Sequence, residues 1–316
     1  MKAIRFARFG GPEVLTMETV STCHAEADEI VVEVGATAVN PSDVKNIRGF
    51  MSHTTLPRTP GRDFAGVVRE GPSGLIGADV FGCGGELGFV RDGTHAEYVR
   101  LPRGGVVVRP RRIGVEQAAG IGVPFVTALA CLRETDGLRS GQTVLVSGAT
   151  GAVGGAACQI AAWKGLRVLG TVRRASDAPR ILGEMIDLSA GPLDEQVRRL
   201  TAGRGADIFI DTVGLIGGGL RAIAEGGRVA VISHGSERVV PIDLLDLYRR
   251  NLHLTGINSL LFDACTCARL LTEMIDGFER GALRPPSVGR VLGLEQAAQA
   301  YQAVEEGAPA RVILRP

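Results

Sequence analysis

The chain lacks the features that would place it in a membrane, on nucleic acid or outside the cell. Its 35 Lys and Arg residues balance 34 Asp and Glu residues, so there is no basic surplus for nucleic acid or an anionic membrane. No unbroken apolar run is long enough to span a bilayer. The N-terminal sequence MKAIRFARFG enters a strand pattern without the apolar core of a signal peptide, so we expect a cytoplasmic protein.

Cysteine is present, but not in the spacing that binds metal. The six cysteines include no C-x-x-C pair. Cys265 and Cys267 fall in a run with helical spacing, where residues two apart point to different faces. We therefore expect most cysteines to be small buried hydrophobic residues, and we predict no metal site.

Lysine is scarce, with only Lys2, Lys45 and Lys164 among the basic residues. Because nearly all other basic positions carry arginine, Lys45 is a candidate for a site that needs the mobile point charge of an ammonium group rather than the planar donors of a guanidinium group. The alternative is a surface lysine on a loop.

The length of 316 residues predicts more than one domain, since single cores usually split below this size. Residues 1–115 contain short β-type runs broken by Gly, Pro and Asp, which predict a mostly β unit. Strands alternate with helices over residues 116–261, which predicts a doubly wound parallel α/β sheet. Residues 262–316 carry helix and strand patterns that we expect to return to the first unit.

The most informative segment runs from Thr143 to Arg174. An apolar strand, TVLVS, leads into a glycine turn, an apolar helix and a second strand, RVLGTV. This order is typical of a dinucleotide-binding unit, in which amides at the helix N-terminus hold the pyrophosphate; the alternative is a purely structural turn. The expected pyrophosphate site consists of Gly148, Ala149, Thr150, Gly151, Ala152, Val153 and Gly154.

An acid is missing where an NAD-binding unit would carry one. About 20 residues after the turn, Asp or Glu would bind the 2′-hydroxyl of the ribose. The chain instead has Arg173 and Arg174 at the end of the second strand. A guanidinium matches the oxygens of a 2′-phosphate, which favours NADPH, although two arginines could also belong to a solvated loop.

Six motifs, in order, carry a family resemblance: VNPSDVKNIRG, TPGRDFAGVV, FVTAL, VLVSGATGAVG, IFIDTVG and ARVIL. The chain resembles the zinc-independent quinone oxidoreductase (zeta-crystallin-like) branch of the medium-chain dehydrogenase/reductase superfamily, over nearly its whole length. The resemblance implies a Rossmann-type cofactor domain, a GroES-like, mostly β catalytic domain, NADPH as hydride donor, and a homodimer.

The resemblance also implies that zinc is absent. Zinc-dependent relatives hold their metal with a His in a PGHE signature and a nearby Cys. This chain reads PGRD at that point, and NPSD stands where the cysteine loop would be. Arg62 of the PGRD motif keeps its proton and cannot act as an ordinary zinc ligand.

By similarity, the catalytic candidates near the nicotinamide and substrate are Asn40, Asp43 and Lys45. The further cofactor candidates are Thr127, Val213, Gly214, Ser233, Asn258 and Arg311. Several of these residues have structural alternatives. Asn40 and Asp43 could form a turn, Thr127 could pack in its helix, Asn258 could cap a turn, and Arg311 could be an exposed strand residue. Asp211 could cap a helix rather than contact the cofactor.

The resulting hypothesis is an NADPH-dependent reductase of quinones or α,β-unsaturated carbonyl compounds that transfers hydride directly, without metal. One alternative is an enoyl-thioester reductase, for which the basic run Arg109–Arg112 could line a groove. Another is an NADPH-binding sensor or structural protein without turnover. The apolar last sheet strand, NLHLTGINS, favours a dimer or a covering loop. Whether Phe50 or His53 lines the substrate cleft stays open.

Overall fold

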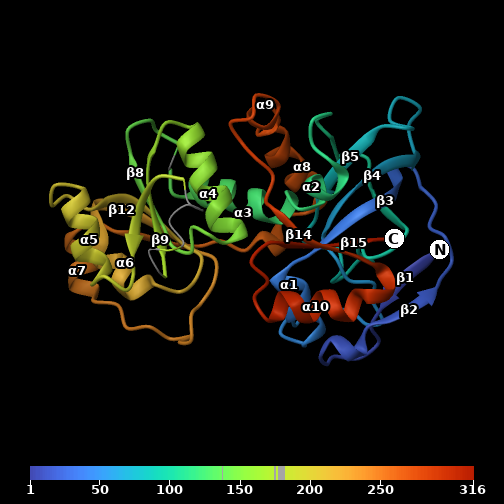
Figure 1. The fold of residues 1–316 in the computed structure, drawn as a ribbon, viewed down its shortest axis with the longest axis horizontal. Coiled ribbons are helices and arrows are strands. Elements are labelled where there is room, and N and C mark those ends of the chain that lie inside the picture. The colour runs from blue at the N-terminus through green and yellow to red at the C-terminus, as the bar shows by residue number, and fades with distance from the viewer. Residues whose placement is uncertain (137, 174–175, 177–181) are drawn as a thin grey trace. The chain divides into compact units, whose positions relative to one another are not determined.

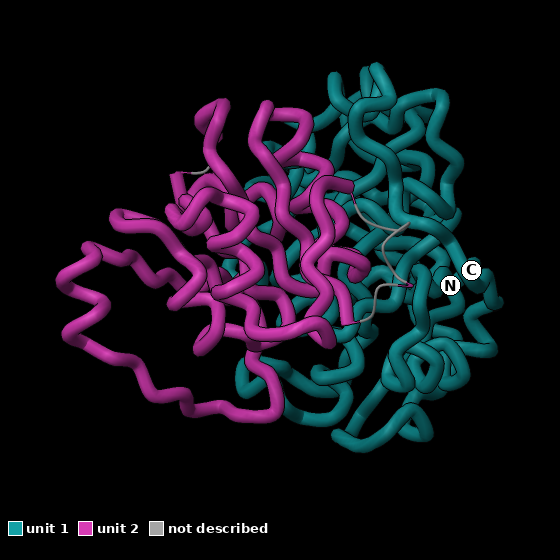
Figure 2. The backbone as a smooth tube through the Cα atoms, turned by 60° about the vertical axis from the view of Figure 1, so that its left-hand side comes forward, with its two compact units in different colours: residues 1–126, 259–316 teal, residues 127–258 magenta. Residues whose placement is uncertain are grey.

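A computed structural model describes residues 1–316 except 137, 174–175 and 177–181, and these residues form two compact units (Figures 1 and 2). Unit 1 contains residues 1–126 and 259–316, drawn in teal in Figure 2, and unit 2 contains residues 127–258, drawn in magenta. The first division falls later than the predicted boundary at residue 115, because α2 (Val115–Ala119) packs on strands of unit 1. The second falls slightly earlier than the predicted boundary at residue 261.

Unit 1 is built on a seven-stranded sheet in the order β14-β15-β3-β4-β5-β7, with β6 paired to β3. A separate antiparallel pair joins β1 (Lys2–Arg5) to β2 (Thr16–Thr19). The strands of the main sheet are β3 (Glu29–Val39), β4 (Asp63–Glu70), β5 (Asp79–Cys83), β6 (Tyr98–Pro102), β7 (Val107–Val108), β14 (Val288–Gly293) and β15 (Arg311–Arg315). The helices of unit 1 are α1 (Pro41–Ile47), α2, α8 (Ala264–Thr272), α9 (Ile275–Glu279) and α10 (Ala297–Glu305), with short 3-10 turns at Pro12–Val14, Ser259–Leu261 and Leu294–Gln296.

The pairing of β15 with β3 positions two polar residues. Val312 lies opposite Val39, and Ile313 lies opposite Ala38, in an antiparallel register. Continuing this register by one residue places Arg311 opposite Asn40. Alternate residues of β3, such as Ile30, Val32 and Val34, pack in one hydrophobic core with Phe64, because successive side chains of a strand point to opposite faces.

Unit 2 is a six-stranded parallel sheet in the order β10-β9-β8-β11-β12-β13. Its strands are β8 (Thr143–Val146), β9 (Arg167–Val172), β10 (Glu184–Asp187), β11 (Ala206–Asp211), β12 (Ile223–Val231) and β13 (His253–Gly256). Its helices are α4 (Ala152–Trp163), α5 (Leu193–Leu200), α6 (Ile216–Ala222) and α7 (Leu244–Arg249), and α3 (Gly122–Glu134) crosses the division between the units. Numbered from β8, this order is the 3-2-1-4-5-6 arrangement of dinucleotide-binding sheets, so the predicted fold class is confirmed.

The strand order of this sheet reverses between β8 and β11, and ligands of such sheets bind at this point, beyond the carboxyl ends of the strands. Within the described part of the chain, no helix has both the length and the apolar character needed to cross a bilayer.

Candidate functional site

Three buried side chains form a hydrogen-bonded cluster inside unit 1. Arg311 donates from Nη2 to Oδ1 of Asn40 at 2.9 Å and to Oδ2 of Asp63 at 3.0 Å. Asn40 donates from Nδ2 to the same Asp63 oxygen at 3.0 Å. The backbone N–H of Val123 donates to the other oxygen of Asp63 at 2.7 Å. The carboxylate of Asp63 is therefore both ion-paired and hydrogen-bonded, which is what a buried charge requires.

Burial and pairing act in opposite directions on this cluster. Burial raises the pKa of Asp63, and the guanidinium of Arg311 opposes that rise. Burial likewise lowers the pKa of Arg311, while Asp63 and then Asp43 oppose the fall. Because Arg311 is 7% exposed, the structure excludes the alternative of an exposed strand residue.

Asp43 closes the turn that begins α1. Its Oδ2 accepts the backbone N–H of Asn40 at 2.7 Å, and Pro41 follows Asn40 in the first helical position. Its Oδ1 has no hydrogen-bond partner among the described residues, and burial raises the pKa of Asp43 to about 7. Asp43 is thus a turn-forming residue with an incompletely satisfied carboxyl group.

A buried histidine, His95, lies against Gly61, two residues before Asp63, and a buried tyrosine, Tyr301, contacts that histidine. The hydroxyl oxygen of Tyr301 is 3.1 Å from Nδ1 of His95, and a Cβ on Gly61 would lie 2.3 Å from Cδ2 of His95. Burial lowers the pKa of His95 to about 4, so its ring is neutral at pH 7. Neither residue has a sequence motif of its own, and only their long-range packing reveals them.

The glycine turn after β8 has the geometry of a pyrophosphate cradle. Gly148 has φ +62°, and a Cβ there would lie 2.7 Å from Cγ1 of Val213. A Cβ on Gly154 would lie 2.2 Å from the carbonyl oxygen of Gly148, so glycine at this position lets α4 pack closely on the turn. Gly151 is the N-cap of α4, whose first amides lack acceptors within the helix. These residues fit a dinucleotide pyrophosphate.

Asp211 ties this turn to the loop after β11. Its Oδ1 accepts the hydroxyl of Ser147 at 2.7 Å and the backbone N–H of Gly214 at 2.9 Å. Gly214 has φ +84°, and a Cβ there would lie 1.9 Å from the nitrogen of Gly235. Asp211 is fully buried and holds backbone groups of the loop after β11, but the alternative that it caps a helix is wrong, because the N-cap of α6 is Leu215, without a side-chain cap.

Two family models match the chain. Residues 26–111 match an alcohol dehydrogenase GroES-like domain, and residues 152–272 match a zinc-binding dehydrogenase. A zinc-type alcohol dehydrogenase-like protein of Schizosaccharomyces pombe is 37% identical over 289 residues, which cover 89% of this chain and 86% of that protein.

Quinone oxidoreductase of Sus scrofa is 30% identical over 328 residues, covering 99% of this chain and 97% of that protein. The crystal structure of an NAD-dependent alcohol dehydrogenase matches with a TM-score of 0.88 and 32% identity, over the full length of both chains. The chain belongs to the quinone oxidoreductase-like family of medium-chain dehydrogenases/reductases. It is therefore an oxidoreductase of a family that binds a nicotinamide cofactor.

One relative and one matching family model are named for zinc, and Arg62 decides whether this chain could bind zinc at the same place. Its Nε donates to the carbonyl oxygen of Gly84 at 3.0 Å, and its Nη2 donates to that of Ser259 at 3.0 Å. The side chain is buried, and a guanidinium presents only donors. The residues at this position of the family pattern do not fit a zinc ion.

The other predicted cofactor residues of unit 2 follow the carboxyl ends of its strands. Arg173 is exposed directly after β9, and Arg174 lies outside the described residues. Val213 is 45% exposed after β11, Ser233 is half-buried after β12, and Asn258 is exposed after β13. Thr127 is buried in α3, and its Oγ1 has no partner among the described residues. Their cofactor contacts stay predictions.

The remaining catalytic candidates lie at the surface of unit 1. Lys45 is exposed in the last turn of α1. Phe50 is 74% exposed, and His53 is exposed and stacks on Phe89 with ring centroids 5.2 Å apart. Sequence reasoning named Asn40, Asp43 and Arg311 but missed Asp63, the common partner of Asn40 and Arg311. The signal was present, because Asp63 stands in the TPGRD motif at the start of β4.

Proposed function

We propose that the protein is an NADPH-dependent oxidoreductase that reduces quinones or α,β-unsaturated carbonyl compounds by direct hydride transfer without metal. The observation that carries the cofactor preference is Arg173, an exposed cation directly after β9, where an NAD-selective unit would carry an acid. The substrate class is supported by the likeness to quinone oxidoreductase of Sus scrofa. Metal independence is supported by Arg62, because its buried guanidinium group presents only hydrogen-bond donors where a metal site would need a ligand.

The cofactor is assigned to the carboxyl edge of the sheet in unit 2. The turn from Gly148 to Gly154 would hold the pyrophosphate, and Arg173 with Arg174 would hold the 2′-phosphate. A cavity of about 290 Å³ in unit 2 is lined by Leu188, Gly214, Ile216 and Val240 among others, and its apolar walls suit a planar base.

NADPH, when bound, supplies a hydride from its nicotinamide ring. The protein must then orient the electron-poor carbon and stabilise the negative charge that develops on a carbonyl oxygen. The exposed ammonium of Lys45 is our candidate for holding the nicotinamide ribose or stabilising that charge. Asn40 and Asp43 act as positioning residues, since their polar atoms hold Asp63, Arg311 and the start of α1.

The basic run Arg109–Arg112 supports the alternative of an enoyl-thioester reductase only weakly, because two of its arginines already have partners. Arg109 forms an ion pair with Asp79 at 2.8 Å, and Arg112 donates to the carbonyl oxygen of Glu279 at 2.7 Å. These two guanidinium groups are engaged within unit 1 rather than held ready for an anionic carrier.

A homodimer is part of the same proposal. β13 lies at one edge of the sheet, and its Leu254 is 41% exposed. Pairing of this edge with a second copy would cover both the apolar side chain and the backbone groups of the strand.

The substrate class is tested by following NADPH consumption with matched panels of quinones, simple enones and enoyl thioesters. Higher kcat/KM for quinones or simple enones supports the proposal. Preference for thioesters would replace it with acyl-chain reduction. Tight NADPH binding without turnover on any panel would favour a sensor or structural role.

A further inference from the structure

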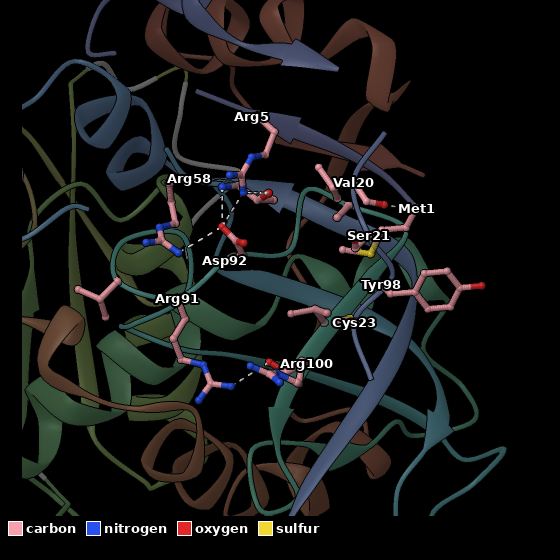
Figure 3. A pocket seen from close by; sticks show the side chains of 15 residues that line it. Met1, Arg5, Val20, Ser21, Cys23, Arg58, Arg91, Asp92, Tyr98 and Arg100 are labelled. Carbon is pink, nitrogen blue, oxygen red and sulfur yellow. Dashed lines mark hydrogen bonds and ion pairs between the residues drawn. The ribbon is translucent and has the colours of Figure 1, made fainter. Parts of the chain in front are cut away.

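A cavity of about 560 Å³ lies wholly within unit 1, between the N-terminal strand pair and the segment that leads into β6 (Figure 3). Its volume is within the range of pockets that hold small molecules. Fifteen residues line it, and Asp92 is the one carboxylate among them. Four of the lining residues are arginines: Arg5, Arg58, Arg91 and Arg100. The wall of this cavity therefore carries an excess of positive charge.

Arg5 and Arg58 share a single carboxylate oxygen. Their Nη1 atoms lie 3.0 and 3.2 Å from Oδ1 of Asp92, which also accepts the backbone N–H of Thr59 at 3.0 Å. The side chains of both arginines are only 16% exposed. Arg58 is fixed further by donating from Nε to the carbonyl oxygen of Thr55 at 3.0 Å. Two poorly hydrated cations thus share one anion, which leaves one positive charge uncompensated (Figure 3).

Arg91 and Arg100 repeat this arrangement with Glu29. Nη2 of Arg91 is 2.9 Å from Oε1 of Glu29, and Nε of Arg100 is 3.3 Å from Oε2. Glu29 is only 15% exposed. Arg100 also pairs with Glu26 at 2.7 Å, and the side chain of Glu26 is 74% exposed, so this ion pair contributes little to stability. Glu29 and Glu26 together balance the charge of this second pair, but little free energy is lost when an incoming anion displaces the exposed Glu26 from Arg100.

We propose that this cavity binds a small molecule with two anionic phosphate groups, one held by Arg5 and Arg58 and the other by Arg91 and Arg100. Guanidinium groups stay charged at every physiological pH, and their planar forks match phosphate oxygens. Phosphate suits each arginine pair because its several oxygens can accept from two forks at once. This site is independent of the proposed reductase function and of the dinucleotide turn in unit 2.

Cys23 supplies a reporter inside the cavity. Burial raises the pKa of its thiol, so little of it is thiolate at pH 7 and its alkylation is slow enough to follow. Cys23 and Cys265 are partly exposed, whereas the other four cysteines are buried. Cys265 lies on α8 and does not line the cavity, which makes it an internal control for reagent access.

The first test is calorimetric titration of the full chain with inorganic pyrophosphate, adenosine 3′,5′-bisphosphate and succinate at low ionic strength. We expect both phosphate compounds to bind and succinate to bind at least about tenfold more weakly. Arg58→Gln should weaken pyrophosphate binding by about tenfold or more, because charged hydrogen bonds are lost. Arg69→Gln is the matched control, since Arg69 pairs with Glu33 at the surface and does not line the cavity.

The variant Asp92→Asn provides a test that misfolding cannot mimic, because it is expected to bind pyrophosphate more tightly than the wild type. This change removes the carboxylate that competes for Arg5 and Arg58, so it should strengthen pyrophosphate binding. Gly154→Ala, which obstructs the dinucleotide turn, should leave pyrophosphate binding at the cavity unchanged, and this separates the cavity from the cofactor site. Failure of Asp92→Asn to tighten binding, or equal loss in Arg58→Gln and Arg69→Gln, would overturn the proposal.

Alkylation by N-ethylmaleimide, followed by peptide mass spectrometry, locates the bound anion. Pyrophosphate should slow modification of Cys23 and leave that of Cys265 unchanged. Unchanged modification of Cys23 at saturating pyrophosphate would place the anion elsewhere, and equal binding of succinate would refute the assignment to phosphates.

Discussion

Nη2 of Arg311 lies 3.0 Å from Oδ2 of Asp63 in the interior of unit 1, where neither side chain is more than 7% exposed. The two residues are 248 positions apart in the sequence, so the pair joins the last strand of the chain to β4. Asn40 contacts both, and Asn40 begins the helix that carries the catalytic candidate Lys45. The turn at Asn40 is therefore held by an ion pair that forms only when the last strand of the chain has joined the sheet of unit 1.

Replacing Arg311 by Ala should destabilise the protein by about 3–5 kcal/mol, because it leaves the carboxylate of Asp63 buried without its counter-ion. Arg280→Ala is the control, since Arg280 pairs with Asp276 at the surface and should matter by less than about 1 kcal/mol. Urea denaturation of both variants measures the difference. Equal effects would mean that the buried pair has no special role in stability.

Replacing Asp43 by Asn should change how stability depends on pH. In the folded protein, burial raises the pKa of Asp43 from 3.8 to about 7. Between those values the folded state keeps a proton that the unfolded state has lost, so rising pH weakens the wild type. Asp43→Asn carries no charge and escapes this loss, which is on the order of 4 kcal/mol at full extent.

The difference in unfolding free energy between Asp43→Asn and wild type should therefore grow from about pH 4 to about pH 7 and level off above that. Urea midpoints at a series of pH values measure it. A difference that does not vary with pH would show that Asp43 titrates at an ordinary value.

Replacing Gly154 by Ala should abolish dinucleotide binding. The added Cβ would lie 2.2 Å from the carbonyl oxygen of Gly148, so the turn must move. Gly155→Ala is the matched control on the same helix, because its Cβ would meet its nearest atom at 3.4 Å, an ordinary contact. Fluorescence titration with NADPH should show loss of binding in the first variant and unchanged binding in the second. Normal binding by Gly154→Ala would place the cofactor elsewhere.

Replacing Arg173 by Ala should weaken the binding of NADPH by about tenfold or more and leave the binding of NADH nearly unchanged, because only NADPH carries the 2′-phosphate. Arg167→Ala is the control at the opposite end of β9, where Arg167 pairs with Glu184 at 2.6 Å. The dissociation constants of both variants and the wild type for NADPH and NADH measure these effects. An equal loss for NADPH and NADH would remove the 2′-phosphate from the role of Arg173.

Much of unit 2 could be predicted from the sequence because its signals are local. The glycine turn from Gly148 to Gly154 sits between a strand and a helix, and Gly148 adopts the positive φ that only glycine adopts readily. The alternation of strands and helices was sufficient to predict the parallel sheet. Arg174 and most of the segment that follows it lie outside the described residues, so the predicted contacts there stay predictions.

The buried cluster in unit 1 could be predicted only in part, because it depends on contacts between distant segments. Asn40 and Asp43 are recognisable from the NPSD motif, but Asp63 has no predicted role, since nothing local shows that its side chain meets Arg311. His95 and Tyr301 were missed for the same reason, since 206 positions separate them in the sequence. The first domain boundary was placed too early because a single sequence does not show that α2 packs on β3 and β4.

The most direct test of the account is the steady-state oxidation of NADPH and of NADH by the wild-type protein, treated with EDTA, in the presence of a simple quinone. We predict turnover with NADPH at a kcat/KM at least about tenfold above that with NADH, and no loss of activity after EDTA treatment. Turnover that prefers NADH, or that depends on added zinc, would contradict the account.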